Sequence, residues 1–425
     1  MNLIKTSLLN GVAAVVKIVT LLGLNKILAL YVGPSGYAAI GQLQNALTMI
    51  TTLSSGAVNT GVTKYTAEHA DDDIKLQRVW KTASSLALGG SAAVGVLVAV
   101  FSQHLSMYFF SVPTYGSVFI WVACSLFFFT FNALLTAILN GKKEVKKLVA
   151  ANILGSLLSL AVTGMLAWQF GLYGALIALG IYQALAFFVT VFLCMRSDWF
   201  GFKKIFGRVD KAVALNLSKY AAMALTSALC LPAAQILIRN HLSFTFGIES
   251  AGYWEAMWRL SSAYLMLVTT TLSVYYLPRL SELKTAREIV VEIIAGYKVI
   301  LPVAVLCCGI VFVMRSFIIK VLFSSDFLPM EQLFLFQLVG DILKIASWLL
   351  AFVMLSKAMY KTYIVTEILF SVSFYGLTVL LTDLHGLRGV VEAYAVNYAI
   401  YWVVMAIVLK SNMKANINSE HSSVA

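Results

Sequence analysis

Several basic residues lie inside long apolar stretches of the sequence, where a charged side chain is unusual. Lys17 is in the middle of the run from Ser7 to Tyr31, Lys26 lies later in the same run, and Arg259 lies in the run from Ala251 to Leu277. Placing such a cation at the centre of a lipid bilayer costs at least about 2.5 to 3.5 kcal/mol on insertion scales. Each is therefore expected to face a wet cavity or an anion. We predict that Lys17, Lys26 and Arg259 bind an anionic part of a substrate.

Two of these cations have an alternative role that involves no substrate. Lys26 lies closer to the end of its run, so its side chain can also extend to the membrane surface. Arg259 follows Glu255 by four residues, a spacing that allows an ion pair within one helix. Lys17 is too deep to reach the surface easily, and it carries the prediction of an anion site most directly.

Three more ionisable residues lie in apolar runs nearer the end of the chain, namely Asp341, Lys344 and Glu367. Asp341 and Lys344 are three positions apart and can neutralise each other on one helix face. Glu367 has no comparable partner at its own depth, which predicts a site for a proton or a sodium ion. We predict ion coupling at these three residues, with a structural pair between Asp341 and Lys344 as the alternative.

Neutral polar side chains mark the start of the second apolar run. Gln42 and Asn45 carry amides that can bind sugar hydroxyls, and we predict that both contact a substrate. Hydrogen bonds between helices, each contributing about 1 kcal/mol in membranes, explain such residues equally well.

Motifs for bond chemistry are absent from the sequence. The five histidines are scattered without metal-ligand spacing, and no Walker A sequence occurs. The five cysteines fall in or at the ends of apolar runs without CxxC spacing, which is typical of packing residues. We predict a protein without a catalytic residue, a metal site or a cofactor.

Membrane-spanning helices must position all these residues. Of the 425 residues, 60% are hydrophobic and 12% are charged, a composition far from that of soluble proteins. The apolar runs can cross a hydrocarbon core of roughly 30 Å. They predict an all-α integral membrane protein with about twelve spans: Ser7 to Tyr31, Tyr37 to Val62, Ala83 to Tyr108, Val118 to Leu139, Leu148 to Trp168, Leu172 to Cys194, Tyr220 to Ile238, Ala251 to Leu277, Val299 to Phe323, Leu333 to Leu355, Tyr363 to Leu381 and Val390 to Leu409.

Basic residues are concentrated on one side of these spans. The connection that holds Lys142, Lys143, Lys146 and Lys147 is one example, whereas we assign only Arg239, Arg315, Lys320 and Arg388 to the opposite side. Because basic connections stay in the cytoplasm, both chain termini are predicted to be cytoplasmic. The net charge of +12 is explained by this bias and by the anionic lipids that it faces, so nothing favours a nucleic-acid partner. Between Ser281 and Lys298, apolar residues at helical spacing predict an amphipathic helix on the inner face.

An internal repeat predicts the architecture. Asn2 to Lys5 precedes the first span as Asn216 to Lys219 precedes the seventh, and Gly36-Tyr37 opens the second span as Gly252-Tyr253 opens the eighth. Six spans is an even number, so the two halves enter the membrane from the same side and are related by a pseudo-twofold axis along the membrane normal. We predict two six-helix bundles, residues 1–211 and 212–425.

The sequence also resembles a family, the Wzx-type flippases of lipid-linked oligosaccharides, within the multidrug/oligosaccharidyl-lipid/polysaccharide exporter superfamily. The likeness covers essentially the whole chain and is most evident in Val32-Gly33-Pro34-Ser35-Gly36, Gly61-Val62-Thr63-Lys64-Tyr65, Ser273 to Pro278 and Gln337 to Lys344.

The resemblance implies a carrier that moves undecaprenyl-pyrophosphate-linked O-antigen repeat units from the cytoplasmic to the periplasmic leaflet of the bacterial inner membrane by alternating access. The implied partners are this lipid-linked oligosaccharide, membrane lipids, a coupling proton or sodium ion, and the polymerase of the same pathway.

Two alternatives have the same fold. One is a flippase for the enterobacterial common antigen lipid intermediate, and the other is a drug/cation antiporter, for which acids are expected to outnumber cations in the binding cleft. A membrane enzyme, such as the polymerase of the pathway, is disfavoured by the short outer connections and the missing nucleophilic or acidic constellation.

Overall fold

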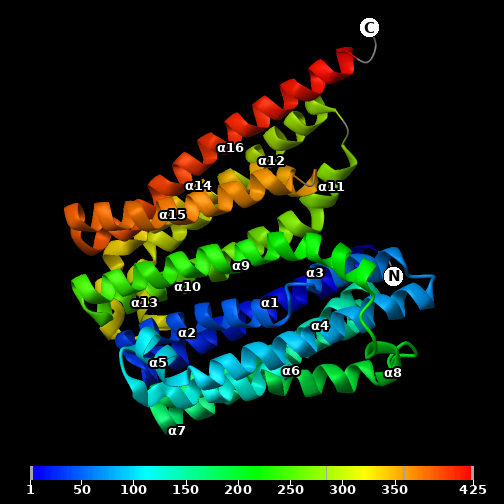
Figure 1. The fold of residues 1–425 in the computed structure, drawn as a ribbon. Coiled ribbons are helices and arrows are strands. Elements are labelled where there is room, and N and C mark those ends of the chain that lie inside the picture. The colour runs from blue at the N-terminus through cyan, green and yellow to red at the C-terminus, as the bar shows by residue number, and fades with distance from the viewer. Residues whose placement is uncertain (1–2, 284, 358, 423–425) are drawn as a thin grey trace. The chain divides into compact units, whose positions relative to one another are not determined.

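A computed structural model describes residues 3–283, 285–357 and 359–422. Asn2, the first residue of the predicted repeat, lies outside this part of the chain, as do the residues at both ends. Across the described residues the chain forms helices joined by short turns, and it contains no strand (Figure 1). The predicted all-α fold is confirmed.

The chain packs as two compact units, Met1–Ile236 and Leu237–Ala425. They divide within helix α9 (Lys211–Phe246), whereas the predicted halves divide at its start. The reason is that the first part of α9 packs with the preceding helices, where Leu217 is fully buried in the core of unit 1.

Unit 1 is built from long helices that lie side by side in Figure 1. Its elements before α9 are α1 (Leu3–Tyr31), α2 (Gly33–Ser54), α3 (Asn59–Glu68), α4 (Asp73–Val100), α5 (Ser102–Phe110), a 3-10 turn (Pro113–Tyr115), α6 (Gly116–Gly141), α7 (Val145–Cys194) and α8 (Phe202–Ile205).

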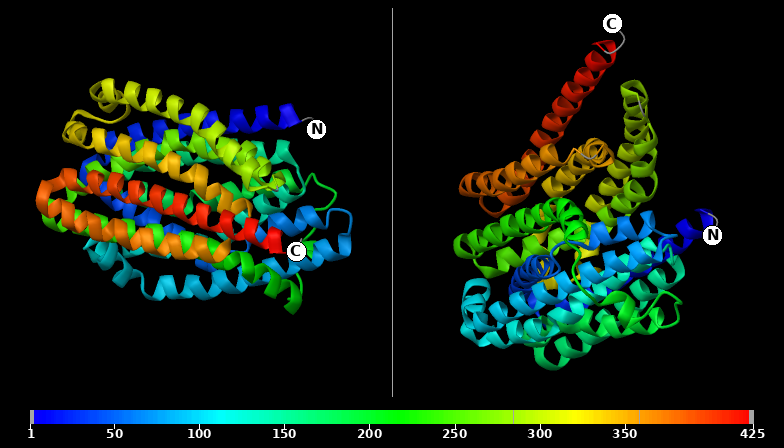
Figure 2. Two further views of the ribbon diagram at one scale, coloured as in Figure 1. Left: turned by 90° about the horizontal axis from the view of Figure 1, so that it is seen from above. Right: turned by 45° about the vertical axis from the view of Figure 1, so that its right-hand side comes forward.

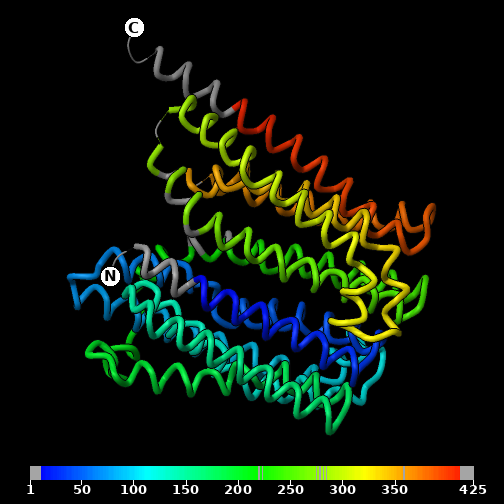
Figure 3. The backbone as a smooth tube through the Cα atoms, turned by 180° about the vertical axis from the view of Figure 1, so that it is seen from behind, coloured from blue at the N-terminus to red at the C-terminus, as the bar shows by residue number. Residues whose placement is uncertain are grey.

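Helix α7 is a hairpin of two helices. Gly171 has φ 57° and ψ −135°, outside the helical region, and the chain reverses its direction there (Figure 3). Only glycine adopts this backbone conformation readily. The two helices pack closely just after this turn. A Cβ added to Gly174 would lie only 1.9 Å from the Leu166 carbonyl oxygen, so glycine is needed there as well. The two halves of α7 thus correspond to two predicted spans.

The second predicted span is wrong at its end. It extends from Tyr37 to Val62, but the structure ends α2 at Ser54 and begins α3 at Asn59. Gly56 and Ala57 between them have φ values of 61° and 52°. These left-handed residues break the helix although the apolar pattern continues.

A hydrophobic core fastens α3, α4 and α6 at the end of unit 1 that carries basic connections. Trp80 is 2% exposed and packs among buried side chains such as Leu134 and Ile138. Its indole N–H donates to Thr66 Oγ1 over 3.0 Å, which fixes α4 to α3. The segments around this core are therefore held in place.

Unit 2 contains the end of α9 and the remaining helices, among which α14, α15 and α16 pack against one another (Figure 2). The elements are α10 (Ile248–Thr271), a π-helical segment (Leu272–Tyr276), α11 (Leu277–Glu282), α12 (Ala286–Val313), α13 (Arg315–Leu322), a 3-10 segment (Ser325–Leu333), α14 (Phe334–Ser356), α15 (Tyr360–His385), a 3-10 turn (Gly386–Arg388) and α16 (Gly389–Ser422).

The predicted amphipathic helix between Ser281 and Lys298 is not a separate element. Helix α12 begins with a capping box formed by Thr285 and Glu288 and continues through Pro302 to Val313. Ile289 and Ile293 are buried on one side of its first turns. The amphipathic pattern thus marks the packed start of a longer helix.

Seven stretches of the described chain are long and apolar enough to cross a membrane. Two of them, Val145–Cys194 and Tyr360–Ser411, each hold two helices. The chain is therefore a multi-pass membrane protein, as predicted.

Candidate functional site

Helix α1 presents Lys17 on a face that it shares with Thr20, Leu21 and Leu24. Spacings of three, four and seven residues place these side chains on one side of a helix. The Thr20 hydroxyl donates to the carbonyl oxygens of Val16 and Lys17 over 2.9 Å each, so its own hydrogen is satisfied within α1. Lys17 is thus directed out of its helix into neighbouring space.

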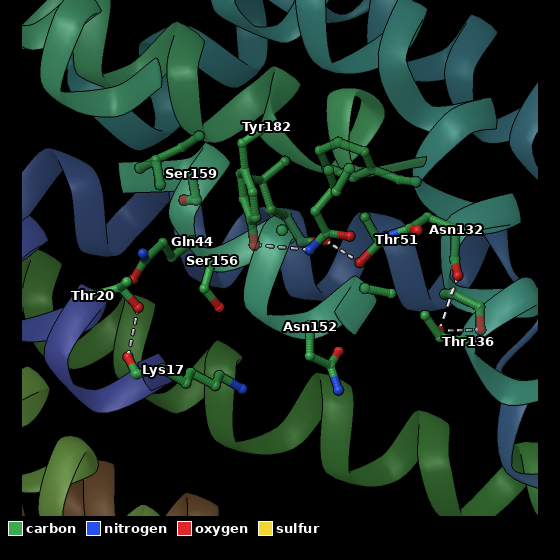
Figure 4. Close-up of a pocket in the computed structure, with 18 of the residues that line it drawn as sticks. Lys17, Thr20, Gln44, Thr51, Asn132, Thr136, Asn152, Ser156, Ser159 and Tyr182 are labelled. Carbon is green, nitrogen blue, oxygen red and sulfur yellow. Dashed lines mark hydrogen bonds between the residues drawn. The ribbon is translucent and has the colours of Figure 1, made fainter. Parts of the chain in front are cut away.

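That space is a cavity of about 640 Å³ within unit 1. Faces of α1, α2, α6 and both halves of α7 enclose it, and Figure 4 shows polar side chains from these helices pointing inward. The polar lining consists of Lys17, Thr20, Gln44, Asn45, Thr48, Thr51, Asn132, Thr136, Asn152, Ser156, Ser159, Tyr182, Gln183 and Thr190. Amides and hydroxyls therefore dominate its chemistry.

Two pairs in the lining are already joined by hydrogen bonds. Thr190 Oγ1 donates to Asn132 Oδ1 over 2.7 Å, and Gln183 Nε2 donates to the Tyr182 hydroxyl oxygen over 3.0 Å. Each bond orients an amide whose remaining donors or acceptors stay available. These pairs hold one wall of the cavity in a defined arrangement.

Other polar side chains in the lining make no hydrogen bond to any residue that the structure describes. They include the Gln44 and Asn152 amides and the Ser156 hydroxyl, which Figure 4 shows at the cavity. In addition, the Asn45 amide nitrogen is buried without a hydrogen-bond partner. Groups of this kind bind sugar hydroxyls or water.

The electrostatic character of the cavity is positive. Lys17 is its one charged side chain among the described residues, and no carboxylate lines it. Lys17 also has no ion-pair partner in that part of the chain, and Figure 4 shows its ammonium extending toward the side where Asn152 lies. A ligand with an anionic group and several hydroxyls complements these features.

The predicted substrate-binding residues divide into three groups. Lys17 and Asn45 line the cavity together. Gln42 is buried beside them on α2 and Lys26 is partly buried on α1, but neither lines the cavity. Arg259 lies in unit 2. Sequence reasoning missed Asn132, Asn152, Ser156, Tyr182 and Gln183. A signal exists for part of this set only, since Asn152, Ser156 and Ser159 recur at i, i+4 and i+7 on one helix face.

Arg259 forms an ion pair with Glu255 in unit 2, and Arg239 shares the same carboxylate. Arg259 Nε donates to Glu255 Oε1 over 3.1 Å, and Glu255 Oε2 accepts from Arg239 over 2.5 Å. All three residues are buried. The ion pair with Glu255 is the structural alternative to substrate binding. Arg239, assigned from the sequence to an outer connection, lies inside α9, because that helix continues to Phe246.

Asp341 and Lys344 are both buried on α14, but in the described chain they do not form an ion pair. Asp341 accepts hydrogen bonds from the hydroxyls of Ser261 over 2.6 Å and of Tyr394 over 2.8 Å, and also from the Tyr264 hydroxyl. These donors come from α10 and α16. The carboxylate thus joins three helices.

The Lys344 ammonium lies among aromatic rings. The ring centroids of Trp258, Tyr398, Trp348 and Tyr394 are 4.9, 5.0, 5.2 and 5.4 Å from its nitrogen. Cation–π attraction to each ring replaces part of the lost hydration. Glu367 on α15 is partly buried and interacts electrostatically with Lys344, so the three predicted ion-coupling residues belong to one region of unit 2.

Comparison with known proteins gives a family and a fold. The sequence model of a family described as polysaccharide biosynthesis protein matches residues 27–332. The Lipid III flippase of Escherichia coli (strain K12) is 29% identical over 403 residues, which cover 95% of this chain and 97% of that protein. The Lipid III flippase of Shigella flexneri gives the same values.

Solved transporter structures have the same fold. An inward-facing multidrug resistance MATE family transporter of the MOP superfamily matches with a TM-score of 0.76 and 15% identity, over 94% of each chain. An outward-facing one matches with a TM-score of 0.67 and 15% identity, over 95% of this chain and 96% of the other. A MOP superfamily transporter from Pyrococcus furiosus, described as having a binding pocket of reverse polarity, matches with a TM-score of 0.63 and 13% identity over the same shares.

Proposed function

Because the chain belongs to the polysaccharide biosynthesis protein family, we propose that it is a flippase for lipid-linked oligosaccharides. The two Lipid III flippases that it resembles over nearly its whole length support this proposal. The protein then moves a substrate between leaflets and makes or breaks no covalent bond.

The observation that carries the proposal is the cavity around Lys17. A pyrophosphate-linked saccharide has an anionic end and many hydroxyls, and the cavity offers one unpaired ammonium beside amides and hydroxyls in the described lining. Lys17 replaces hydration of the phosphate, while Asn45, Asn132 and Asn152 accept and donate hydrogen bonds to sugars. The polyprenyl tail stays in the surrounding lipid.

A drug/cation antiporter fits this cavity poorly. A cationic drug requires acidic side chains, but the described lining contains none and includes a cation. The likeness to multidrug transporters, at 15% identity, concerns the fold.

The proposed cargo is the undecaprenyl-pyrophosphate-linked O-antigen repeat unit, moved from the cytoplasmic to the periplasmic leaflet of the bacterial inner membrane by alternating access. The second candidate is the enterobacterial common antigen intermediate. Lipid III, the cargo in the name of both relatives, belongs in the same test. In this scheme both chain termini are cytoplasmic, and a polymerase of the pathway uses the product.

Ion coupling at Asp341, Lys344 and Glu367 is the proposed energy source. Moving one negative charge outward across an inside-negative membrane gains about 2.3 kcal/mol per 100 mV, but the return of an empty cationic carrier feels the opposite bias. A proton or sodium ion bound in unit 2 can offset that bias. The proposal is abandoned when cargo movement is indifferent to collapse of both the proton and the sodium gradient.

The direct test is reconstitution of the purified protein in lipid vesicles. Fluorescent lipid-linked O-antigen units, enterobacterial common antigen intermediates and lipid III are placed in both leaflets, and a membrane-impermeant reagent that removes outer-leaflet fluorescence is added. A flippase exposes the inner pool as well, so the signal falls toward zero, and the fastest cargo is the native one. Retention of the inner pool for every cargo would refute the proposal.

A further inference from the structure

A second cavity of unit 1, about 360 Å³ in volume, lies among the basic connections. It is enclosed by the start of α4, the connection between α6 and α7, the turn after α7, and α8. These segments lie at the ends of membrane-crossing helices, which is the level of lipid headgroups. The cavity is separate from the one around Lys17, with which it shares no lining residue.

One wall of this second cavity is a closed hydrogen-bond network around Glu144. The carboxylate accepts from Lys147 over 2.7 Å, from Ser197 over 3.3 Å, and from the indole N–H of Trp199. Lys147 also donates to Ser197 Oγ over 2.6 Å. Glu144 and Lys147 therefore neutralise each other and fix the turn after α7 in place.

The other charged side chains of the lining have both signs. Lys142, Arg196 and Lys204 are basic, and Asp73 and Asp198 are acidic. Within the described chain, no ion pair joins any of these acids to any of these bases. The cavity thus holds separated positive and negative groups, and a ligand with both charges can neutralise both.

Two tryptophan rings line the same cavity, and one of them contacts a cation of the lining. The Lys142 ammonium lies 5.6 Å from the centroid of the Trp80 ring, and the Trp80 and Trp199 rings are 5.5 Å apart. Trp80 is buried in the core of unit 1 and Trp199 is partly buried, so both rings are fixed parts of the cavity wall. Cation–π attraction to the Trp80 ring therefore helps to hold the Lys142 ammonium at the cavity.

We propose that this second cavity binds a zwitterionic phosphate ester, in which an ammonium group is joined to the phosphate by a short linker, as in the headgroup of phosphatidylethanolamine. Lys142 and Arg196 contact the phosphate, and Asp73 and Asp198 accept hydrogen bonds from the ammonium. Phosphatidylglycerol leaves both carboxylates without a partner. Phosphatidylcholine has no N–H to donate to them.

The experiment measures which lipid the intact protein retains. The protein is placed in nanodiscs of phosphatidylglycerol with equal small amounts of phosphatidylethanolamine and phosphatidylcholine, and retained lipids are counted by native mass spectrometry. Wild type is expected to retain phosphatidylethanolamine over each other lipid by roughly two- to fivefold, the range given by exposed charge pairs.

Two variants and two matched controls locate the site. Asp198→Asn is expected to remove the preference for phosphatidylethanolamine over phosphatidylcholine. Arg196→Gln is expected to lower retention of both. Asp71→Asn and Lys203→Gln make the same charge changes nearby, at residues that do not line the cavity, and are expected to behave as wild type.

A third arm separates a lipid from a soluble source of the same chemistry. In this arm, soluble phosphoethanolamine is added to the protein in nanodiscs of phosphatidylglycerol alone, and the melting temperature is measured. If the melting temperature rises for wild type but not for Arg196→Gln, the site binds a free zwitterion. Equal retention of the three lipids by wild type with no such rise overturns the proposal, as does a preference unchanged in both variants. None of these outcomes depends on flipping.

Discussion

Lys17 differs from the other deeply placed cations of the chain in its surroundings. Arg239 and Arg259 share the carboxylate of Glu255, and Lys344 is enclosed by aromatic rings. Lys17 instead faces a cavity whose described lining has no acid. A cation kept in a membrane without a counterion is costly, and an anionic ligand removes that cost when it binds.

Replacing Lys17 with alanine is expected to abolish export while the protein still inserts into the membrane. Loss of a charged hydrogen bond of about 1.5 to 3 kcal/mol lowers cargo binding roughly 10- to 100-fold. Lys17→Arg retains part of the activity, because the charge persists in a different geometry. The measurement is the rate of cargo movement at limiting cargo concentration.

The matched control is Lys26→Ala, which removes the same charge from the same helix at a position that does not line the cavity. We expect a much smaller loss of transport for it. Equal losses for the two variants would mean that transport depends on the net charge of α1 and not on a cation at the cavity.

Glu144 predicts a dependence of stability on pH. It lies between α6 and α7, outside the membrane-spanning segments. Burial raises its pKa, but hydrogen bonds from Lys147 and Trp199 outweigh burial, and the net pKa is lowered from its usual 4.5. A lowered folded-state pKa stabilises the fold above the unfolded-state pKa, and this contribution is lost as the pH falls through the folded-state value.

Wild type is therefore expected to exceed Glu144→Gln in melting temperature at pH 7, by an amount equivalent to about 1 kcal/mol. The difference should disappear as the pH falls well below 4.5. Thermal unfolding of both proteins in the same detergent measures it. A difference that grows on acidification has the wrong sign for this explanation.

At the scale of helices, the close contact between α2 and α4 constrains the wall that carries Asn45. A Cβ at Gly90 would lie 2.2 Å from the Ser54 carbonyl oxygen, at the end of α2. Gly90→Ala is expected to destabilise the protein by about 1 to 3 kcal/mol, because backbone must move to relieve the overlap. Thermal unfolding of the purified protein measures the loss.

The neighbouring Gly89 provides the control, since a Cβ added there meets nothing within 4 Å. Gly89→Ala is expected to be neutral or to stabilise α4 by up to about 1 kcal/mol, the difference in helix propensity. If both variants unfold at the same temperature, the close contact between α2 and α4 does not contribute to stability.

Helices and their approximate positions follow from the sequence because long apolar runs have one stable form in lipid. Breaks and continuations of helices that depend on backbone conformation do not follow from the sequence. Gly56 and Ala57, with φ values of 61° and 52°, break the second span. A single glycine in an apolar run is only a weak signal, and alanine is a strong helix former. The start of α12 has an amphipathic pattern, and only packing shows that it continues into the span.

The site was predictable to a smaller extent. Lys17 stands out because a charge in an apolar run is rare. Neutral amides such as Asn132, Asn152 and Gln183 do not, since each alone is as compatible with a hydrogen bond between helices. Their shared role depends on which helices are neighbours, and the sequence by itself does not provide that.

At the scale of the whole molecule, the two units treat their ionisable residues differently. Unit 1 leaves Lys17 in an open polar cavity, whereas unit 2 encloses Asp341 among hydroxyl donors and Lys344 among rings. This division supports a scheme in which unit 1 binds the cargo and unit 2 binds the coupling ion.

Gradient-dependent transport should then be lost in Glu367→Gln while cargo binding is preserved. Equilibrium binding of fluorescent cargo to both proteins measures the second part.

The most direct test of the central claim is the leaflet on which undecaprenyl-pyrophosphate-linked oligosaccharide accumulates in cells that lack the protein. Wild type and Lys17→Ala are returned to these cells as rescue arms. We predict accumulation on the inner leaflet that wild type relieves and Lys17→Ala does not. Accumulation of single repeat units on the outer leaflet, or full relief by Lys17→Ala, would contradict a flippase that works through the cation of this cavity.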